Sequence, residues 1–191
     1  MSRPTPKPVR KDAVQNRAAL LRAARIVLSE QGLDAPLDLI AEKAGVGRGT
    51  LYRHFADRTE LALAVLEADV ADLGRRTAEQ GDDPAAFFWF LDRLAEDMIR
   101  NAGLAGLVRN VRSPDALTPL RQSLMEAGAA SLKRAQAAGL VREDLRPMDI
   151  RLIATLLGAG FQGADAAERQ AVSLRTRAIV LDGLKPRAEG R

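Results

Sequence analysis

Residues 37–55 constrain the fold of this chain more than any other stretch, because two short helical patterns are joined there by a glycine. Apolar side chains recur at helical spacing in both halves, at Leu37, Ile40 and Ala41 and then at Leu51 and Phe55. Between them, Gly45 tolerates the positive φ at which many helices end. We therefore expect helices over 37–44 and 48–55, joined by a tight turn as in a helix-turn-helix.

The second of these helices has a face of hydrogen-bonding side chains opposite its buried edge. With the apolar edge turned inward, the side chains that project outward are Arg48, Thr50, Tyr52, Arg53 and His54. The major groove of B-DNA admits one helix, and side chains of these types bind its base edges and phosphates. The sequence therefore predicts a reader of double-stranded DNA, with contact residues Arg48, Thr50, Tyr52, Arg53 and His54.

Charge is distributed along the chain in a way that fits this prediction. The first 58 residues hold eleven Lys or Arg and six Asp or Glu, whereas the remaining residues hold eighteen and nineteen. A basic segment joined to a nearly neutral one is typical of a DNA-binding domain attached to a second domain. A solvated basic tail is the alternative interpretation, since residues 1–11 supply four of the eleven basic residues.

Composition excludes most kinds of catalytic and metal site. The 191 residues contain no cysteine and one histidine, so thiolate ligands, cysteine nucleophiles and histidine clusters are excluded. Residues 158–163 match the dinucleotide-binding pattern G-x-G-x-x-G, but the residues before them continue a helical stripe where that motif needs a strand. We expect no enzyme, cofactor or metal ion. The chain shows no signal peptide or membrane span, which predicts a cytoplasmic protein.

Residues 17–66 resemble the DNA-binding domain of the TetR/AcrR family of bacterial transcriptional regulators. The resemblance rests on an ungapped compound motif made of Ile40, Ala44-Gly45-Val46, Gly49-Thr50-Leu51-Tyr52, His54-Phe55 and Leu61. Residues 134–150 also resemble a segment of the ligand-binding domain in some members. The resemblance implies a homodimer that represses transcription from a palindromic operator and is released by a small-molecule effector.

The family pattern also implies a role for each matching side chain. Thr50, Tyr52 and His54 are expected to contact phosphates or the groove wall. The resemblance also implies DNA contacts at Gly49, within the matching motif, and at Arg58, where a phosphate contact is expected. Arg48 and Arg53 stand at positions that read bases, which agrees with the ability of arginine to bind guanine bidentately.

Three positions depart from the family pattern. Gly47 replaces the usual capping serine of the recognition helix, and Arg58 replaces the usual lysine of the next helix. Pro36 stands where the preceding helix usually has a capping threonine or serine, and Asp34 or Asp38 is the expected substitute cap.

Helical spacing continues beyond residue 58 without a strand pattern, which predicts an all-α fold. We expect a helix-turn-helix domain joined to a helical ligand-binding and dimerisation domain. The predicted boundaries are a disordered basic arm at 1–11, the DNA-binding domain at 12–57 with Asp12 capping its first helix, the second domain at 58–185, and a disordered tail at 186–191.

Four of the seven aromatic residues lie together at positions 87–90. Consecutive positions on a helix point in different directions, so some of these rings are expected to line a cavity, although burial of all four in the core is an equal alternative. The predicted ligand pocket consists of Phe87, Phe88, Trp89, Met98, Leu104, Leu107, Val108 and Met125.

Residues 150–161 place small side chains beside large apolar ones, a pattern that lets a second helix approach closely. In the resembling family the last two helices form the homodimer interface. The predicted interface residues are Ile153, Ala154, Leu157, Gly158, Phe161, Val172, Ala178 and Ile179.

A second function remains open at this point. The chain is alternatively a helical ligand- or partner-binding module that keeps the helix-turn-helix without reading a specific DNA sequence. Salt-dependent, sequence-selective binding to promoter DNA distinguishes the two hypotheses.

Overall fold

The computed structural model describes residues 9–32, 34–101, 104, 111, 114–158 and 165–186. All regular elements within these ranges are helical, which confirms the all-α fold class. In that same part of the chain, no helix is long and apolar enough to span a membrane. The elements are α1 (Val9–Gln31), α2 (Leu37–Lys43), α3 (Arg48–His54), α4 (Arg58–Ala78), α5 (Ala86–Arg100), η1 (Pro114–Leu117), α7 (Thr118–Ala137), α8 (Asp149–Gly158) and α9 (Ala166–Gly183).

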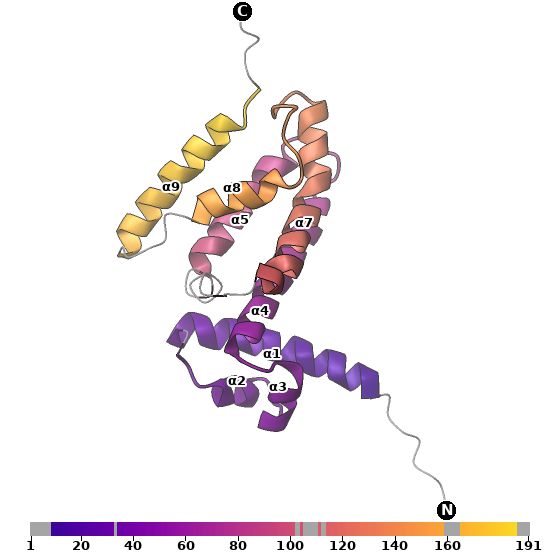
Figure 1. Cartoon of the computed structure of the whole chain (residues 1–191), viewed down its shortest axis with the longest axis vertical. Coiled ribbons are helices and arrows are strands. Elements are labelled where there is room, and N and C mark those ends of the chain that lie inside the picture. Colours follow the sequence, from indigo (N-terminus) through magenta and orange to yellow (C-terminus); the bar gives the residue numbers. More distant parts are fainter. Residues whose placement is uncertain are drawn as a thin grey trace, which may run out of the picture.

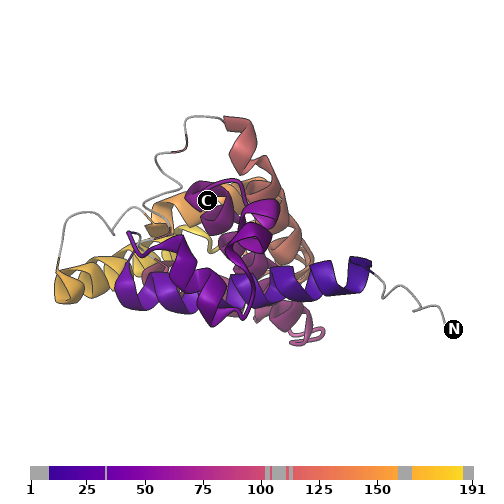
Figure 2. The same cartoon turned by 90° about the horizontal axis from the view of Figure 1, so that it is seen from below.

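The first three helices and the start of α4 form a small domain at one end of the molecule (Figure 1). α1 lies across this domain, and α2 and α3 lie on the side of α1 that faces away from the C-terminal helices. Figure 2 views the molecule from this end, with α1 running across the view. The most deeply buried side chains of this N-terminal core are Leu20, Ile40, Leu51, Phe55, Leu61 and Val65.

The remaining helices surround a second core. It gathers apolar side chains from α4, α5, α7, α8 and α9, with Phe87 and Phe90 of α5 fully buried at its centre. The two rings stack, with centroids 6.2 Å apart and planes 16° from parallel. The first and last of the four consecutive aromatic residues therefore belong to the core.

α4 is the structural link between the two cores. Leu61 and Val65 in its first half belong to the N-terminal core, and Leu73 in its second half belongs to the second core. At Gly74, α4 approaches α7 so closely that an added Cβ would lie 3.1 Å from the Cβ of Ala127. The glycine thus permits α4 to pack tightly against the second domain.

Two sequence-based expectations about the N-terminal helices are wrong. α1 begins at Val9, so residues 9–11 are helical, and Asp12 lies in the first turn and is not the cap. Pro8 is the last proline before this helix, and nothing after it prevents helix formation. At α2, Pro36 occupies the N-cap without a side-chain hydrogen bond, so neither Asp34 nor Asp38 supplies the missing cap. The carboxylate of Asp38 pairs with Arg48 of α3 instead.

Candidate DNA-binding surface and ligand-binding domain

The turn between α2 and α3 sets the orientation of the predicted reader helix. Gly45 has a φ of 68°, and the amide of Val46 donates to the carbonyl of Ala41 at 3.0 Å. Gly47 then takes the N-cap of α3 without a side-chain hydrogen bond, as its lack of a side chain requires. A seven-residue helix with so weak a cap depends on tertiary packing for its stability.

Two buried side chains supply that packing. Leu51 is 1% exposed and Phe55 is 2% exposed, and both lie in the N-terminal core. The opposite face of α3 is open to solvent along Arg48, Gly49, Tyr52 and Arg53, and Thr50 and His54 are half-buried at its edges. The structure thus places these six predicted contact residues on one helix that faces away from the second domain.

The two predicted base-reading arginines are held against the surface of the helix-turn-helix. Arg48 pairs with Asp38 of α2 at 3.1 Å, and its guanidinium lies 5.6 Å from the ring centroid of Tyr52. The Nη2 of Arg53 donates to Thr50 Oγ1 at 2.9 Å, and its Nε donates to the carbonyl of Gly49 at 3.2 Å. Both arginines are exposed, so these contacts cost little to exchange for contacts with DNA.

The seventh predicted contact residue, Arg58, begins α4 directly after α3. This helix start is well capped, because Asp57 Oδ1 accepts from the amide of Glu60 at 2.8 Å. Glu60 Oε2 in turn accepts from the amide of Ala56 at 2.6 Å. The reciprocal bonds resemble a capping box and fix where α4 leaves the reader.

The predicted pocket residues that the structure describes have different surroundings. Phe87 is core, whereas Phe88 and Trp89 are half-buried, and the guanidinium of Arg76 lies 5.4 Å from the Trp89 ring centroid. Met98 covers Gly158, and Met125 is half-buried on α7.

Leu104 packs in the N-terminal core and not in the core of the second domain, and its side chain is 4% exposed. Leu107 and Val108 lie outside the described residues. The predicted ligand pocket therefore remains a prediction.

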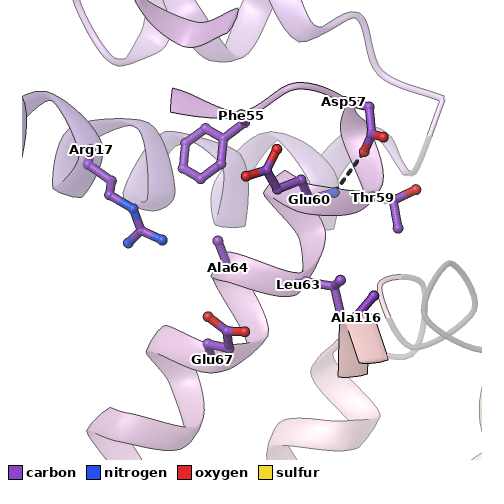
Figure 3. A pocket seen from close by; sticks show the side chains of 9 residues that line it. All are labelled: Arg17, Phe55, Asp57, Thr59, Glu60, Leu63, Ala64, Glu67 and Ala116. Atoms are coloured by element: carbon purple, nitrogen blue, oxygen red, sulfur yellow. Dashed lines mark hydrogen bonds between the residues drawn. The ribbon is translucent and has the colours of Figure 1, made fainter. Parts of the chain in front are cut away.

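A cavity of about 370 Å³ lies where the two domains meet (Figure 3). Glu60 and Glu67 reach it from α4, opposite Arg17 of α1, and Ala116 of η1 closes one side. The guanidinium of Arg17 lies 5.4 Å from the ring centroid of Phe55. A second groove of about 490 Å³ runs between α4 and α7. None of the predicted pocket residues lines either space.

Two family models match the chain, one for each domain. The model described as bacterial regulatory proteins, tetR family, matches residues 20–65. The model described as transcriptional regulator SbtR-like, C-terminal domain, matches residues 82–186, which is more than half of the chain. The chain belongs to the TetR family of bacterial transcriptional regulators. The family resemblance of residues 17–66, and the prediction of a DNA-binding regulator, are confirmed.

Relatives of known sequence and structure agree with this assignment. An uncharacterized HTH-type transcriptional regulator of Mycobacterium tuberculosis is 33% identical over 152 residues, which cover 76% of this chain and 78% of the relative. The crystal structure of the TetR regulator SCO0520 from Streptomyces coelicolor is 33% identical, with a TM-score of 0.63 over 90% of this chain and 99% of that one.

Two further solved structures share the fold. The TetR regulatory protein from Mycobacterium vanbaalenii is 29% identical, with a TM-score of 0.64 over 93% of this chain and 99% of that one. RolR in complex with its ligand resorcinol is 20% identical, with a TM-score of 0.61 over 93% of this chain and 98% of that one. At that identity the likeness to RolR shows the fold alone.

The two helices predicted to form the dimer interface, α8 and α9, contain both buried and exposed apolar residues. Ile153, Ala154 and Leu157 of α8 are buried within the protomer, and Gly158 lies under the methyl group of Met98. On α9, Val172, Ala178 and Ile179 are exposed. Phe161 lies outside the described residues.

The exposed apolar side chains of α8 were missed by the sequence-based prediction. Leu152 is 53% exposed and Leu156 is 55% exposed, each one position before a buried residue. The two leucines are four positions apart, which places both on one face of α8. Met148, just before α8, is 53% exposed as well. That spacing was visible in the sequence, but periodicity alone does not tell which of two apolar faces meets the protomer's own core.

Proposed function

We propose that this protein is a homodimeric repressor that binds a palindromic operator through α3 and is released by a small-molecule effector. The observation that carries the proposal is the outward face of α3, where six predicted contact residues share one helix whose opposite edge is buried at Leu51 and Phe55. Such a protein acts where the bacterial chromosome lies, in the cytoplasm.

The contact residues divide into two groups by their chemistry. Arg48 and Arg53 present guanidinium groups that can bind guanine O6 and N7 bidentately, so they are proposed to read bases. Thr50, Tyr52, His54 and Arg58 offer contacts suited to phosphates, which position the helix without selecting a sequence.

Dimerisation is proposed to use the exposed apolar face of α8 and α9. Leu152 and Leu156 of α8 and Val172 and Ile179 of α9 leave apolar surface in water that burial against a second copy would remove. α9 lies along the outer edge of the molecule in Figure 1, where a second copy has access to it. Two reader helices related by a two-fold axis would then meet successive major grooves, which requires a palindromic operator.

The effector is proposed to be a small apolar or amphipathic molecule bound within the second domain. Phe88, Trp89 and Met98 are half-buried beside its core and are available to line a pocket. RolR, which shares the fold, was solved with the small aromatic ligand resorcinol. An effector that binds best when α4 is displaced lowers operator affinity by its differential affinity for the two states.

The proposal is tested by fluorescence-anisotropy titration of the protein with its own upstream DNA and a scrambled duplex of equal length. We expect tighter binding to the upstream DNA at two salt concentrations, with affinity for both duplexes falling as salt rises. Equal, weak binding to both duplexes would favour the alternative of a ligand- or partner-binding module that reads no specific sequence.

A further inference from the structure

Asp69 occupies the position on α4 at which the helix passes from one core to the other. Ala68 packs against the N-terminal core, and Val70 packs against the second core. The side chain of Asp69 is only 14% exposed, although it is a carboxylate. A carboxylate so well covered at the joint between two domains requires charged or hydrogen-bonding partners.

Its partners come from two other helices, one in each domain. Asp69 Oδ1 accepts from the guanidinium of Arg25 on α1, which is also its ion-pair partner. Asp69 Oδ2 accepts from the side-chain amide of Asn101 at 3.0 Å. Asn101 is the C-cap of α5, so one carboxylate joins α1, α4 and the end of α5.

A second contact fixes the same end of α5 to the reader. Leu104, three residues after the C-cap, is buried in the N-terminal core among side chains of α1 to α4. α5 itself begins in the second core with Phe87 and Phe90. This helix therefore has one end in the domain proposed to bind effector and the other end tied to the DNA-binding domain.

The electrostatics show how Asp69 is held. Burial raises the pKa of its carboxyl group above the ordinary value, and the charge of Arg25 and the hydrogen bond from Asn101 offset this only in part. A neutral side chain of the same shape removes the buried charge without opening a cavity. Asp69→Asn is therefore expected to fold, because breaking an ion pair is strongly destabilising when it leaves an unpaired charge buried, and this variant leaves none deep in the core. Arg25 stays solvated, since its side chain is 46% exposed.

We infer that the Arg25–Asp69–Asn101 cluster couples effector binding in the second domain to operator binding by α3. A shift of α5 on effector binding pulls Asn101, and Asp69 passes the displacement to α1, on which α2 and α3 are packed. By reciprocity, operator binding at α3 must disfavour the shifted position of α5, and we expect it to hold the last turn of α5 more firmly in its unshifted position. The inference rests on the proposed function, because it names how that function is regulated.

Hydrogen–deuterium exchange on the full-length protein tests this link without knowledge of the effector. Exchange is measured for the free protein and for the protein saturated with the duplex that it binds selectively. In the wild type, operator binding should slow exchange of the amides at 97–101 by roughly fivefold or more, the low end of ordinary coupling between sites. In Asp69→Asn, the slowing should remain in α1 to α3 and disappear from 97–101.

Two further variants make the result specific. Asn101→Ala cuts only the α5 side of the cluster and should lose the same response, so the test does not depend on Asp69→Asn alone. Asp72→Asn is the matched control, because Asp72 lies on the same helix and pairs with Arg75 of that helix at 2.6 Å. It should keep the wild-type response. A merely structural role would speed exchange in free and bound protein alike and leave their ratio unchanged.

Wild-type slowing at 97–101 that persists in both Asp69→Asn and Asn101→Ala would overturn the inference. Selective operator binding without any slowing at 97–101 in the wild type would also overturn it, while leaving the proposed function intact. A wild-type protein that binds no duplex selectively would overturn the proposed function, and the inference with it.

Discussion

The DNA-binding domain and the second domain both bury an apolar core, but they display their functional side chains in opposite ways. On α3, the predicted contact residues are those that remain outside once Leu51 and Phe55 are buried. In the second domain, Phe87, a predicted pocket residue, is itself part of the core. A function on the surface of one helix follows from that helix's periodicity, whereas a function in a cavity depends on gaps between helices.

The largest expected effect comes from Phe55→Ala, which tests whether the two cores unfold separately. Removing this ring should cost about 3–5 kcal/mol of stability and unfold the N-terminal domain first, because α3 has no other strong anchor besides Leu51. Urea unfolding would be followed by circular dichroism for all helices and by the fluorescence of Trp89, the single tryptophan, for the second domain. Phe90→Ala is the matched control and should shift the Trp89 transition instead. A single transition that shifts equally in both variants would contradict the comparison.

A smaller effect is expected from Gly128→Ala in the second core. An added Cβ would lie 2.9 Å from both Ile150 Cδ1 and Phe90 Cε1, so overpacking should cost about 1–3 kcal/mol despite the better helix propensity of alanine. Gly183→Ala is the control, since a Cβ there meets no atom within 4 Å. Thermal unfolding of both variants measures the difference. Equal stability of the two would show that the core tolerates expansion and is less tightly packed than the structure indicates.

Arg48→Ala tests the surface function of the reader. We expect operator affinity to fall by about 1–3 kcal/mol and preference to relax at one base position, because a base-reading guanidinium is removed. Anisotropy titrations with operator variants changed one base pair at a time measure both quantities. Tyr52→Phe is the comparison variant and should weaken binding to all sequences about equally. If Arg48→Ala lowered the affinity for operator and for scrambled DNA by the same factor, the base-reading role would be refuted.

The smallest effect concerns pH and the joint between the domains. Because burial raises the pKa of Asp69 above 3.8, its protonated form is the one that folding favours. The stabilisation from this group is complete below its unfolded pKa and is lost as pH rises through the higher folded pKa. The stability of the wild type relative to Asp69→Asn should therefore fall as pH rises from below 4 through that folded pKa, and then level off. Urea unfolding from about pH 3 to pH 7 checks this, and a relative stability that rises with pH would contradict it.

The N-terminal domain could be predicted closely because the residues that define its helices and its turn lie close together in the sequence. Leu51 and Phe55 are four positions apart, and Gly45 marks the turn before them, so local spacing fixed which face of α3 points outward. The errors there were also local. The start of α1 was misplaced by four residues, since a cap at Asp12 would begin the helix at residue 13 and α1 begins at Val9. Asp34 or Asp38 was expected to cap α2, but Asp38 pairs with Arg48.

The second domain could be predicted only as a set of helices. Nothing near Leu104 in the sequence indicates that it packs in the N-terminal core, because the other residues of that core are at least 36 positions earlier in the chain. Periodicity likewise did not tell that Leu152 and Leu156, and not Ile153 and Leu157, form the exposed face of α8. The cluster at Asp69 joins positions 25, 69 and 101, a relation that only the tertiary structure reveals.

The most direct test of the central claim is selection of binding sites from a random-sequence duplex library by the full-length protein. If α3 reads bases in a two-fold dimer, the enriched duplexes should share a palindrome whose half-sites lie about one helical turn, or a multiple of it, apart. The same selection with Arg48→Ala should lose preference at one symmetric pair of positions. Enrichment of no common sequence by the wild type would contradict sequence-specific reading by this surface.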